Sequence, residues 1–419
     1  MRIVVIGAGV VGTTLAYELL KDGHEITVLE RNDKPAEGTS YANAGLIAPG
    51  HSFTWASPKA PKVLLKSLYS GGQALRFKPS ADPDLWIWML KFLRECTASA
   101  AESNTLIKHA LCMYSQSQLE RLTEETGVGY HHIDKGILYL YRNPDSFAAG
   151  REHMKLLADD GQQVQNLTGE EAAAIDPALE ASKHLIAGAV YCPTDGSGDA
   201  RLFTRNLADY VTDKGVTFKF GTEVRKVVTD GGKASAVETE QGEFPADAVV
   251  FCTGVLGMDL LKKHGLRLPI YPVKGYSMTV PLDISSPAAN RAPTVGGVDE
   301  DNLVAYARIG DRMRLTAVAE FSGYDRSFND KDFDSMLASA QSLFPGVGDY
   351  AQAEKWAGLR PMTPTGIPYM DRTRTPGLYA SVGHGHMGWT MAPGSARLMA
   401  DLIVGTKPAL PMENFALPN

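Results

Sequence analysis

The ten residues VGHGHMGWTM, at positions 382–391, combine three glycines with two histidines and a tryptophan. Imidazoles are common metal ligands and general bases, so His384 and His386 admit either chemistry. A metal site needs further ligands and supporting acids, and the sequence places none nearby. The glycines admit a third chemistry, in which backbone N–H groups approach a flat ligand closely. The backbone alternative is therefore favoured over the metal site, and the general base stays open.

A second glycine-rich segment follows a β-branched run at residues 3–6, which predicts a buried strand. Gly7, Gly9 and Gly12 form the pattern G-x-G-x-x-G before a predicted helix. Gly7 permits a tight turn, Gly9 lets the backbone approach a pyrophosphate, and Gly12 allows close packing of helix on strand. The next predicted strand ends in Glu30. Its carboxylate can accept hydrogen bonds from the ribose hydroxyls of the cofactor and would repel the 2′-phosphate of NADP. The unit predicts a site for NAD or FAD and disfavours NADP.

The segment at residues 31–50 differs from a plain nicotinamide-binding domain, which returns quickly to a helix and a third strand. Its small polar residues let the chain run beside an extended ligand and offer it hydrogen bonds. This favours FAD, whose second half reaches far beyond the first two strands. The residues expected to contact the dinucleotide here and in the glycine turn are Val10, Val11, Arg31, Thr39, Ser40, Asn43, Ala44, Gly45 and Leu46.

Two later segments have the features of a nucleotide cleft. Residues 215–230 predict a pair of strands, in which Val224 presents its backbone N–H and C=O to an adenine edge. Residues 246–257 predict a strand that returns to the parallel sheet and ends at Thr253 and Gly254, near the cofactor. Each segment alone is equally consistent with an ordinary strand and turn.

Arg360 precedes Pro361 within WAGLRPMTPTGIPYM, residues 356–370. A guanidinium on a backbone held by proline can bind a carboxylate through two parallel hydrogen bonds. A structural arginine in an ion pair is the usual alternative. The residue type alone leaves both roles open.

The chain resembles the D-amino-acid oxidase superfamily of FAD-dependent amine oxidoreductases, and within it the bacterial D-amino-acid dehydrogenases. The segments that carry the resemblance, in family order and over nearly the whole chain, are VVIGAGVVGTTLAYELLKDGHEITVLER, AEGTSYANAGLIAPG, PVKGYSMTV, WAGLRPMTPTGIPYM and GHGHMGWTMAPGSARLMADLI. The resemblance implies that the protein binds FAD non-covalently and that Arg360 binds the substrate α-carboxylate. It also implies that the residues facing the flavin include Gly358, Gly383, His384, Gly385, Met387, Gly388, Trp389 and Thr390. The family often has an apolar or hydroxyl residue where this chain has His386.

The implied reaction is oxidative deamination of D-amino acids. Hydride passes from Cα to flavin N5, and the imino acid product hydrolyses to a keto acid and ammonia. In family terms this step needs no side-chain base, which weakens the general-base alternative for the two histidines. Close alternatives are a cis-4-hydroxy-D-proline dehydrogenase, an opine oxidase subunit, and a sarcosine or glycine oxidase. An NAD-dependent dehydrogenase and a non-catalytic flavin-binding subunit are alternatives of other classes.

The resemblance places the strand at residues 272–280 across the active site. Strand alternation sets Lys274 and Tyr276 on one face. Tyr276 is a candidate for the substrate pocket, and Lys274 for a flavin-side or structural role. The further pocket candidates are His386, His51 and, at lower rank, Tyr306 with Arg308 on its strand face.

Composition bounds the partners and the location. The net charge of −7 argues against nucleic-acid binding. Four cysteines without a CxxC pair fit a reducing compartment and exclude the common zinc and iron–sulfur motifs. No signal peptide or long apolar run is present, so we expect a cytoplasmic protein. The run at residues 84–93 predicts a buried helix, with peripheral contact at the inner membrane as the alternative. The expected partners are a small D-amino acid or N-substituted amino acid, and a quinone or electron-transfer protein as acceptor.

The pattern of segments predicts an α/β fold. A Rossmann-like FAD-binding domain is interleaved with an α+β substrate domain built on an antiparallel sheet. We assign residues 1–80, 180–265 and 355–419 to the FAD-binding domain. Residues 81–179 and 266–354 form the substrate domain.

Overall fold

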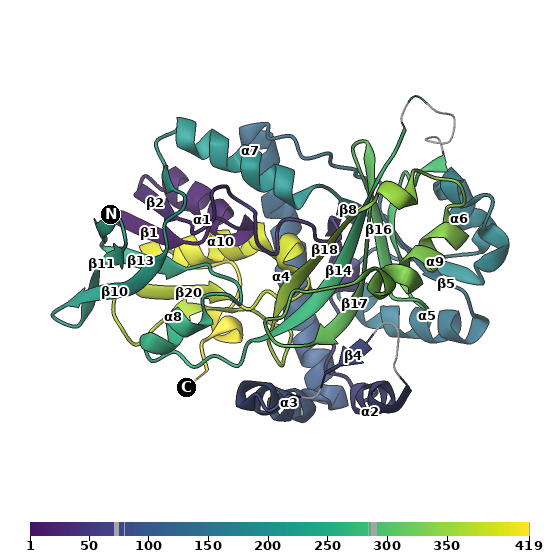
Figure 1. Cartoon of the computed structure of the whole chain (residues 1–419), viewed down its shortest axis with the longest axis horizontal. Helices are drawn as coiled ribbons and strands as arrows, with labels where there is room; N and C mark the ends of the chain where they lie inside the picture. Colours follow the sequence, from purple (N-terminus) through teal and green to yellow (C-terminus); the bar gives the residue numbers. More distant parts are fainter. Residues whose placement is uncertain (71–74, 79, 284, 286–290, 419) are drawn as a thin grey trace.

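The computed structural model describes residues 1–70, 75–78, 80–283, 285 and 291–418. Its strands form two large sheets, which lie to the left and to the right in Figure 1. The left sheet carries the N-terminal strand, and the right sheet is built around the long strands β14 (Tyr271–Pro281) and β17 (Arg312–Phe321). The fold is therefore α/β with two interleaved units.

The left sheet has six strands and is parallel except at one edge. Its order is β19 (Tyr369–Arg372), β20 (Leu378–Val382), β13 (Ala248–Phe251), β1 (Arg2–Ile6), β2 (Glu25–Leu29) and β9 (Thr217–Lys219). Only β19 and β20 run antiparallel. Helix α1 (Val10–Lys21) joins β1 to β2, so the predicted strand–helix–strand unit is confirmed. The predicted return of residues 246–257 to this sheet is confirmed too, because β13 pairs in parallel with β1.

Residues 215–230 do not form the predicted strand pair. Strand β9 joins the six-stranded sheet beside β2. Strand β10 (Val224–Asp230) instead pairs with β11 (Lys233–Thr239), which pairs in turn with β12 (Gly242–Pro245). The prediction failed because the strands are adjacent in sequence but each finds its partner elsewhere in the chain.

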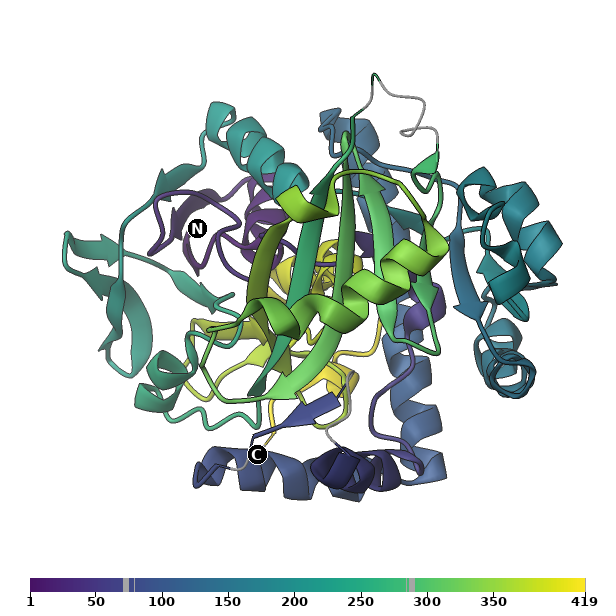
Figure 2. The same cartoon turned by 45° about the vertical axis from the view of Figure 1, so that its right-hand side comes forward.

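The right sheet has nine strands and is mainly antiparallel, as predicted. Its order is β18 (Glu354–Met362), β14, β17, β16 (Val304–Ile309), β15 (Gly296–Asp299), β5 (Ile137–Tyr141), β7 (Gly188–Cys192) and β6 (Gln165–Leu167), with β4 (Leu75–Phe77) beside β17. The β15–β5 and β17–β4 pairs are parallel. The turn between β16 and β17 lies at Gly310, which has a φ of 62°. Figure 2 shows α9 (Asp334–Leu343) crossing one face of this sheet.

The structure departs from the predicted domain bounds at several elements. The long helix α4 (Ala98–Thr126) falls in the range assigned to the substrate domain, yet it packs against α10 (Gly388–Val404) and its side chains pair with those of α1. Its Leu111 and Leu119 are buried in the same core as Leu15 of α1. Strands β4, β7 and β18 depart in the opposite direction, because they pair within the nine-stranded sheet. The chain crosses between the units more often than its composition indicates.

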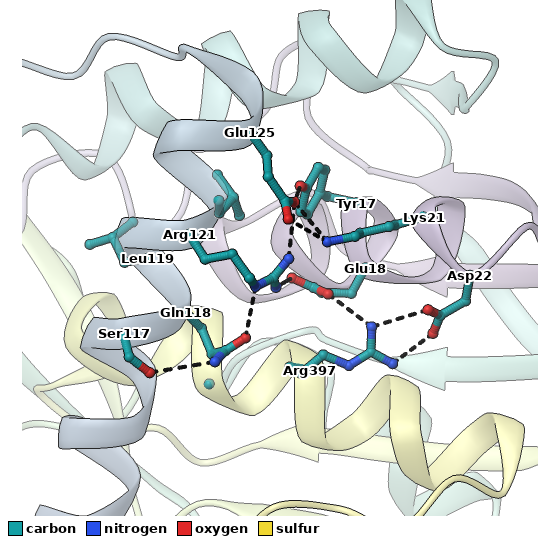
Figure 3. Close-up of polar contacts among 12 residues, drawn as sticks. Tyr17, Glu18, Lys21, Asp22, Ser117, Gln118, Leu119, Arg121, Glu125 and Arg397 are labelled. Carbon is teal, nitrogen blue, oxygen red and sulfur yellow. Dashed lines mark hydrogen bonds and ion pairs between the residues drawn. The ribbon is translucent and has the colours of Figure 1, made fainter.

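An ion-pair cluster joins α1, α4 and α10, as Figure 3 shows. The Glu18 carboxylate of α1 is fully buried and accepts hydrogen bonds from Arg121 of α4 and Arg397 of α10. Arg397 also binds Asp22 at 2.6 Å. The paired guanidinium groups compensate the burial of Glu18, which would otherwise be costly. The cluster fixes α4 and α10 against the helix that follows the glycine turn.

The helix predicted to be buried at residues 84–93 is half exposed. It forms part of α3 (Pro83–Glu95), in which Trp88 is buried but Trp86 and Leu90 are 51% and 55% exposed. Helix α2 (Ala60–Ser70) lies next to it at the bottom of Figure 1 and also exposes apolar side chains. Among the described residues, no helix is long and apolar enough to cross a membrane.

The remaining elements connect these layers. They are β3 (Leu46–Ile47), η1 (Pro49–His51), α5 (Pro144–Asp159), α6 (Gly169–Ile175), β8 (Gly196–Ser197), α7 (Ala200–Asp213) and α8 (Met258–Lys263).

Candidate functional site

A single continuous cavity of about 920 Å³ runs from the glycine turn after β1 to the helices α2 and α3. Both large sheets contribute to its walls. The residues predicted to contact the cofactor that line it are Gly7, Gly9, Val10, Val11, Glu30, Arg31, Thr39, Ser40, Asn43, Ala44, Gly45, Leu46, Val224, Thr253, Gly254, Gly358, His384, Gly385, Met387, Gly388, Trp389 and Thr390. Gly12 and Gly383 do not line it. A cavity of this length suits an extended ligand with a substrate at one end.

The glycine turn at one end has the geometry expected of a dinucleotide site. Gly7 has a φ of 107°, and a Cβ on Gly12 would lie 2.0 Å from the Gly7 carbonyl oxygen. Both glycines therefore serve the tight turn and the packing of α1 on β1, as predicted. At Gly9 a Cβ would meet only the Ser40 hydroxyl, at 3.5 Å, so this glycine faces open space. The Glu30 carboxylate accepts a hydrogen bond from the Ala8 N–H at 2.8 Å.

Four buried polar atoms of residues on the cavity wall have no hydrogen-bond partner among the described residues. They are Thr253 Oγ1, Ser381 Oγ, His386 Nε2 and Trp389 Nε1. Buried polar groups in native proteins are normally paired, and an unpaired one is costly. These atoms come from separate segments of the chain and lie along one cavity. A ligand with many polar groups, such as a flavin dinucleotide, fits this wall.

The glycine-histidine loop enters α10 at Gly388, with residues 384–390 on the cavity wall. The first turn of α10 thus points free N–H groups and a positive dipole end toward the cavity. Pro393 lies inside α10, five residues after the helix begins at Gly388. Gly383 is required for close packing of the loop, since a Cβ there would lie 2.7 Å from the Thr363 side chain. The predicted flavin contact of Gly383 is therefore corrected.

His384 turns its side chain away from the cavity. Its Nε2 lies 3.2 Å from the Ser395 hydroxyl of α10, in the buried core. Burial lowers the pKa of His384 to about 4. Its backbone lines the cavity, but the imidazole anchors the loop to α10 and faces neither a metal nor a substrate.

This burial predicts acid lability of the fold. In the unfolded chain His384 takes up a proton below its ordinary pKa of 6.5, whereas the folded chain resists protonation down to about pH 4. Stability therefore falls as the pH falls through this window and levels off below it, by on the order of 2–3 kcal/mol from this residue. Urea unfolding across the window measures the slope. His384→Gln is expected to flatten it relative to wild type, and an unchanged slope would contradict the assignment.

Arg360 lies on β18 with its guanidinium at the cavity wall. Its Nη1 donates to the Val318 carbonyl at 2.8 Å and lies 3.4 Å from the Lys274 carbonyl. Within the described residues, Nη2 and Nε make no hydrogen bond and no carboxylate forms an ion pair with the group. Burial alone lowers the pKa of Arg360 to about 10. A buried cation without an acidic partner is a site for an anionic ligand, and its fork matches a carboxylate.

A β-bulge and a glycine set the position of this guanidinium. Strand β17 has one residue more than β14 between the pairs Lys274–Glu320 and Tyr276–Ala317. Within the bulge Val318 has a φ of 66°, a strained value for a β-branched residue, and its carbonyl reaches Arg360. A Cβ on Gly275 would lie 2.3 Å from the guanidinium carbon, so only glycine leaves room for the Arg360 side chain.

Gly275→Ala is therefore expected to displace the guanidinium while leaving the glycine turn of β1 intact. We expect KM for a carboxylate substrate to rise by about 10-fold or more with flavin content unchanged, because a misplaced fork loses one of two hydrogen bonds. Steady-state kinetics and flavin absorbance measure the two quantities. Gly129→Ala, where a Cβ would meet nothing within 4 Å, is the control, and an unchanged KM in Gly275→Ala would contradict the proposed packing.

Tyr306 does not take the pocket role predicted for it, Tyr276 lines the cavity only in part, and Lys274 takes the structural alternative of its two predicted roles. Tyr276 contributes to the cavity wall, but its hydroxyl donates to Glu320 at 2.6 Å on the face of β14 opposite Arg360. Lys274 is fully buried on that face, 3.0 Å from Glu320. Tyr306 packs edge-on against Phe344 in the core. Alternation placed Lys274 and Tyr276 together correctly, but it does not say which face meets the ligand.

His51 and His386 lie together on the cavity wall, as predicted for pocket residues. Their rings are 6.1 Å apart and perpendicular. Sequence reasoning missed Trp55, which stacks on His386 at 4.9 Å. It also missed Lys108 of α4. This lysine donates a hydrogen bond to the Phe53 carbonyl at 2.9 Å and so holds the segment between His51 and Trp55. The position of Trp55 four residues after His51 was the available signal; nothing in the sequence marked Lys108.

Comparison with known proteins agrees with this geometry. The family described as FAD dependent oxidoreductase matches residues 2–402. The chain is 44% identical to D-amino acid dehydrogenase 2 of Mesorhizobium japonicum, with 98% of each chain covered. It is 40% identical to D-amino acid dehydrogenase of Paramagnetospirillum magneticum, covering 100% of this chain and 98% of the relative. The structure of glycine oxidase from Geobacillus kaustophilus matches 100% of this chain and 98% of its own, with a TM-score of 0.74 and 25% identity.

These matches span the glycine turn, the Arg360 strand and the α10 loop alike. They argue against the alternative of an NAD-dependent dehydrogenase, because the matched family uses FAD. The unpaired polar atoms of the cavity wall fit that cofactor. The chain belongs to the FAD-dependent oxidoreductases of the D-amino-acid oxidase family.

Proposed function

We propose that this enzyme oxidises D-amino acids to imino acids, which water converts to keto acids and ammonia. The observation that carries the proposal is the half-buried Arg360 guanidinium, which lies on the cavity wall without an acidic partner among the described residues. Relatives at 38–44% identity that are named D-amino acid dehydrogenase support the D configuration.

Different segments of the cavity wall have different roles in this proposal. The glycine turn and the start of α1 would hold the diphosphate of FAD, and Glu30 the ribose. FAD supplies the acceptor for the hydride of the substrate. Arg360 fixes the substrate carboxylate and thereby the orientation of Cα. The first turn of α10 places N–H dipoles where negative charge develops during hydride transfer.

A dye-reduction assay with purified holoenzyme tests the proposal. We expect turnover with several D-amino acids, and much slower turnover with their L-enantiomers. Glycine, sarcosine, cis-4-hydroxy-D-proline and an opine belong in the panel, because each represents a neighbouring activity. Faster turnover of any of these four than of every D-amino acid would overturn the assignment, as would absence of turnover.

We propose further that the enzyme docks on an anionic membrane surface through α2 and α3 and passes its electrons to a membrane quinone. The exposed apolar side chains on these two helices are Val63, Leu65, Trp86, Ile87, Leu90 and Leu93, each 43–56% exposed. Such a patch is unusual on a surface that meets only water. Lys62 and Lys91 lie on the same helices and complement lipid phosphates.

The cavity ends at this face. Val63 and Leu64 of α2 and Phe92 of α3 line it, so a lipophilic acceptor can approach the cofactor from the membrane side. Both helices lie at one pole of the molecule in Figure 2. Apolar burial and electrostatic attraction together are typical of peripheral membrane binding.

Vesicle flotation tests the docking face. Wild type is expected to float with phosphatidylglycerol vesicles and to sediment with phosphatidylcholine alone. The double variant Trp86→Ser and Leu90→Ser should lose most of the binding with dye-linked activity retained, whereas Leu185→Ser, an exposed leucine far from α3, should not. Equal binding by both variants would contradict the proposal. Reduction of a water-insoluble quinone in the vesicles, measured against peroxide formation, tests the acceptor.

A further inference from the structure

His386 occupies a defined place on the cavity wall, in the loop between β20 and α10. Trp55 stacks on one face of its ring, with an angle of 25° between the planes. His51 meets the ring edge-on, at 89°. These two contacts fix the plane of the imidazole, so it is not a loose surface side chain.

Neither ring nitrogen of His386 makes a hydrogen bond within the described residues, and Nε2 is buried. An imidazole buried in this way normally pairs both nitrogens, because an unpaired one loses its hydration without compensation. Nε2 of His384, two residues earlier, has such a partner in the Ser395 hydroxyl. The unpaired nitrogen of His386 therefore indicates a ligand in the cavity.

The charged groups around His386 keep its imidazole neutral. Lys108 of α4, His51 of η1 and Arg360 of β18 face it, and burial together with these basic neighbours lowers the pKa of His386 well below 6.5. Glu300 contacts His51, with its Oε1 3.8 Å from Nδ1 of that ring. His153 faces His51 as a further basic group. A neutral imidazole has one nitrogen that accepts a hydrogen bond.

We propose that His386 is the second polar anchor of the substrate, accepting a hydrogen bond from the α-amino group of the amino acid whose carboxylate Arg360 holds. The inference rests on the proposed function and adds the recognition of the amine. The same basic surroundings disfavour a bound ammonium, so the amino group binds uncharged and its proton goes to bulk water. Oxidation of the Cα–H requires this uncharged amine, so the anchor selects the reactive form of the substrate.

A pair of unreactive ligands isolates the amine contact. 2-Aminoisobutyrate has the carboxylate and the amino group but no Cα–H, and isobutyrate lacks the amino group. Calorimetry on the holoenzyme gives the affinity ratio of the two without turnover. In wild type we expect the affinity of 2-aminoisobutyrate relative to isobutyrate, its advantage, to grow as the pH rises toward the pKa of its amine, because only the uncharged amine binds.

Variants of His386 test the contact through the same affinity ratio. His386→Leu should reduce the advantage of 2-aminoisobutyrate by about 10-fold and leave isobutyrate affinity unchanged, since one hydrogen bond is removed. His386→Gln retains an acceptor oxygen and should restore much of the advantage. His184→Leu, an exposed histidine in the η3 turn (Lys183–Leu185), should match wild type. Arg360→Ala should weaken both ligands.

Two results would overturn the inference. One is an unchanged ligand ratio in His386→Leu; the other is an equal loss for both ligands, which would mean that the ring only shapes the pocket. In either case, normal turnover of D-amino acids by wild type would leave the proposed function standing. Failure of wild type to bind either ligand, together with no turnover of any amino acid, would overturn the function as well.

Discussion

Replacing Arg360 by alanine is expected to raise KM for amino-acid substrates by about 100-fold or more, with bound flavin retained. The guanidinium is half buried on the cavity wall, is cationic and has no acidic partner among the described residues. Removing one member of a buried, hydrogen-bonded charge pair costs about 2–5 kcal/mol, and each 1.4 kcal/mol is a factor of ten. Because Arg360 acts on the substrate, the flavin absorbance of the purified variant should match wild type. Steady-state kinetics over a wide substrate range measures the change.

Arg360→Lys provides the matched control. Lysine keeps the charge but has no fork, so its KM should fall between those of wild type and the alanine variant. In both variants the Val318 carbonyl also loses the hydrogen bond that it accepts from Arg360 in wild type. A KM unchanged in Arg360→Ala would remove this residue from the substrate site. Loss of flavin in the same variant would assign it to the cofactor instead.

Gly9→Val is expected to give a folded protein without FAD. Gly9 has extended backbone angles, a φ of −74° and a ψ of 178°, which any residue adopts. A Cβ there meets only the Ser40 hydroxyl at 3.5 Å, so the valine side chain fits the chain and extends into the cavity. There it blocks the approach of a diphosphate to the start of α1. We expect a colourless protein with unaltered circular dichroism and an affinity for FAD lowered by about 100-fold or more.

Gly12→Ala makes the contrast within the same motif. Its Cβ would lie 2.0 Å from the Gly7 carbonyl oxygen, so this change should destabilise the packing of α1 on β1 and lower the melting temperature. The two variants separate the ligand-facing glycine from the packing glycine. Full flavin content in Gly9→Val would contradict the role of this turn.

Local sequence determined the nucleotide end of the molecule. The β1–α1–β2 unit, its three glycines and the terminal Glu30 lie within thirty residues, and their turn, capping and packing requirements are met by neighbours in the chain. The segment at residues 39–46 was placed correctly beside the cavity for the same reason. The resemblance to the family added Arg360, which a single residue type does not identify.

Only the tertiary structure decided the substrate end. Period-two alternation groups Lys274 with Tyr276, but the pairing of β14 with β18 decides that Arg360 and Gly275 share the face that meets the cavity. The bulge at Val318 depends on the register between β14 and β17, which are joined by a long excursion. The exposure of the apolar side of α3 and the meeting of His51, Trp55 and His386 depend on packing across the two units. A sequence pattern specifies which residues lie on one face of an element, whereas the partner that this face meets is set by contacts between distant segments.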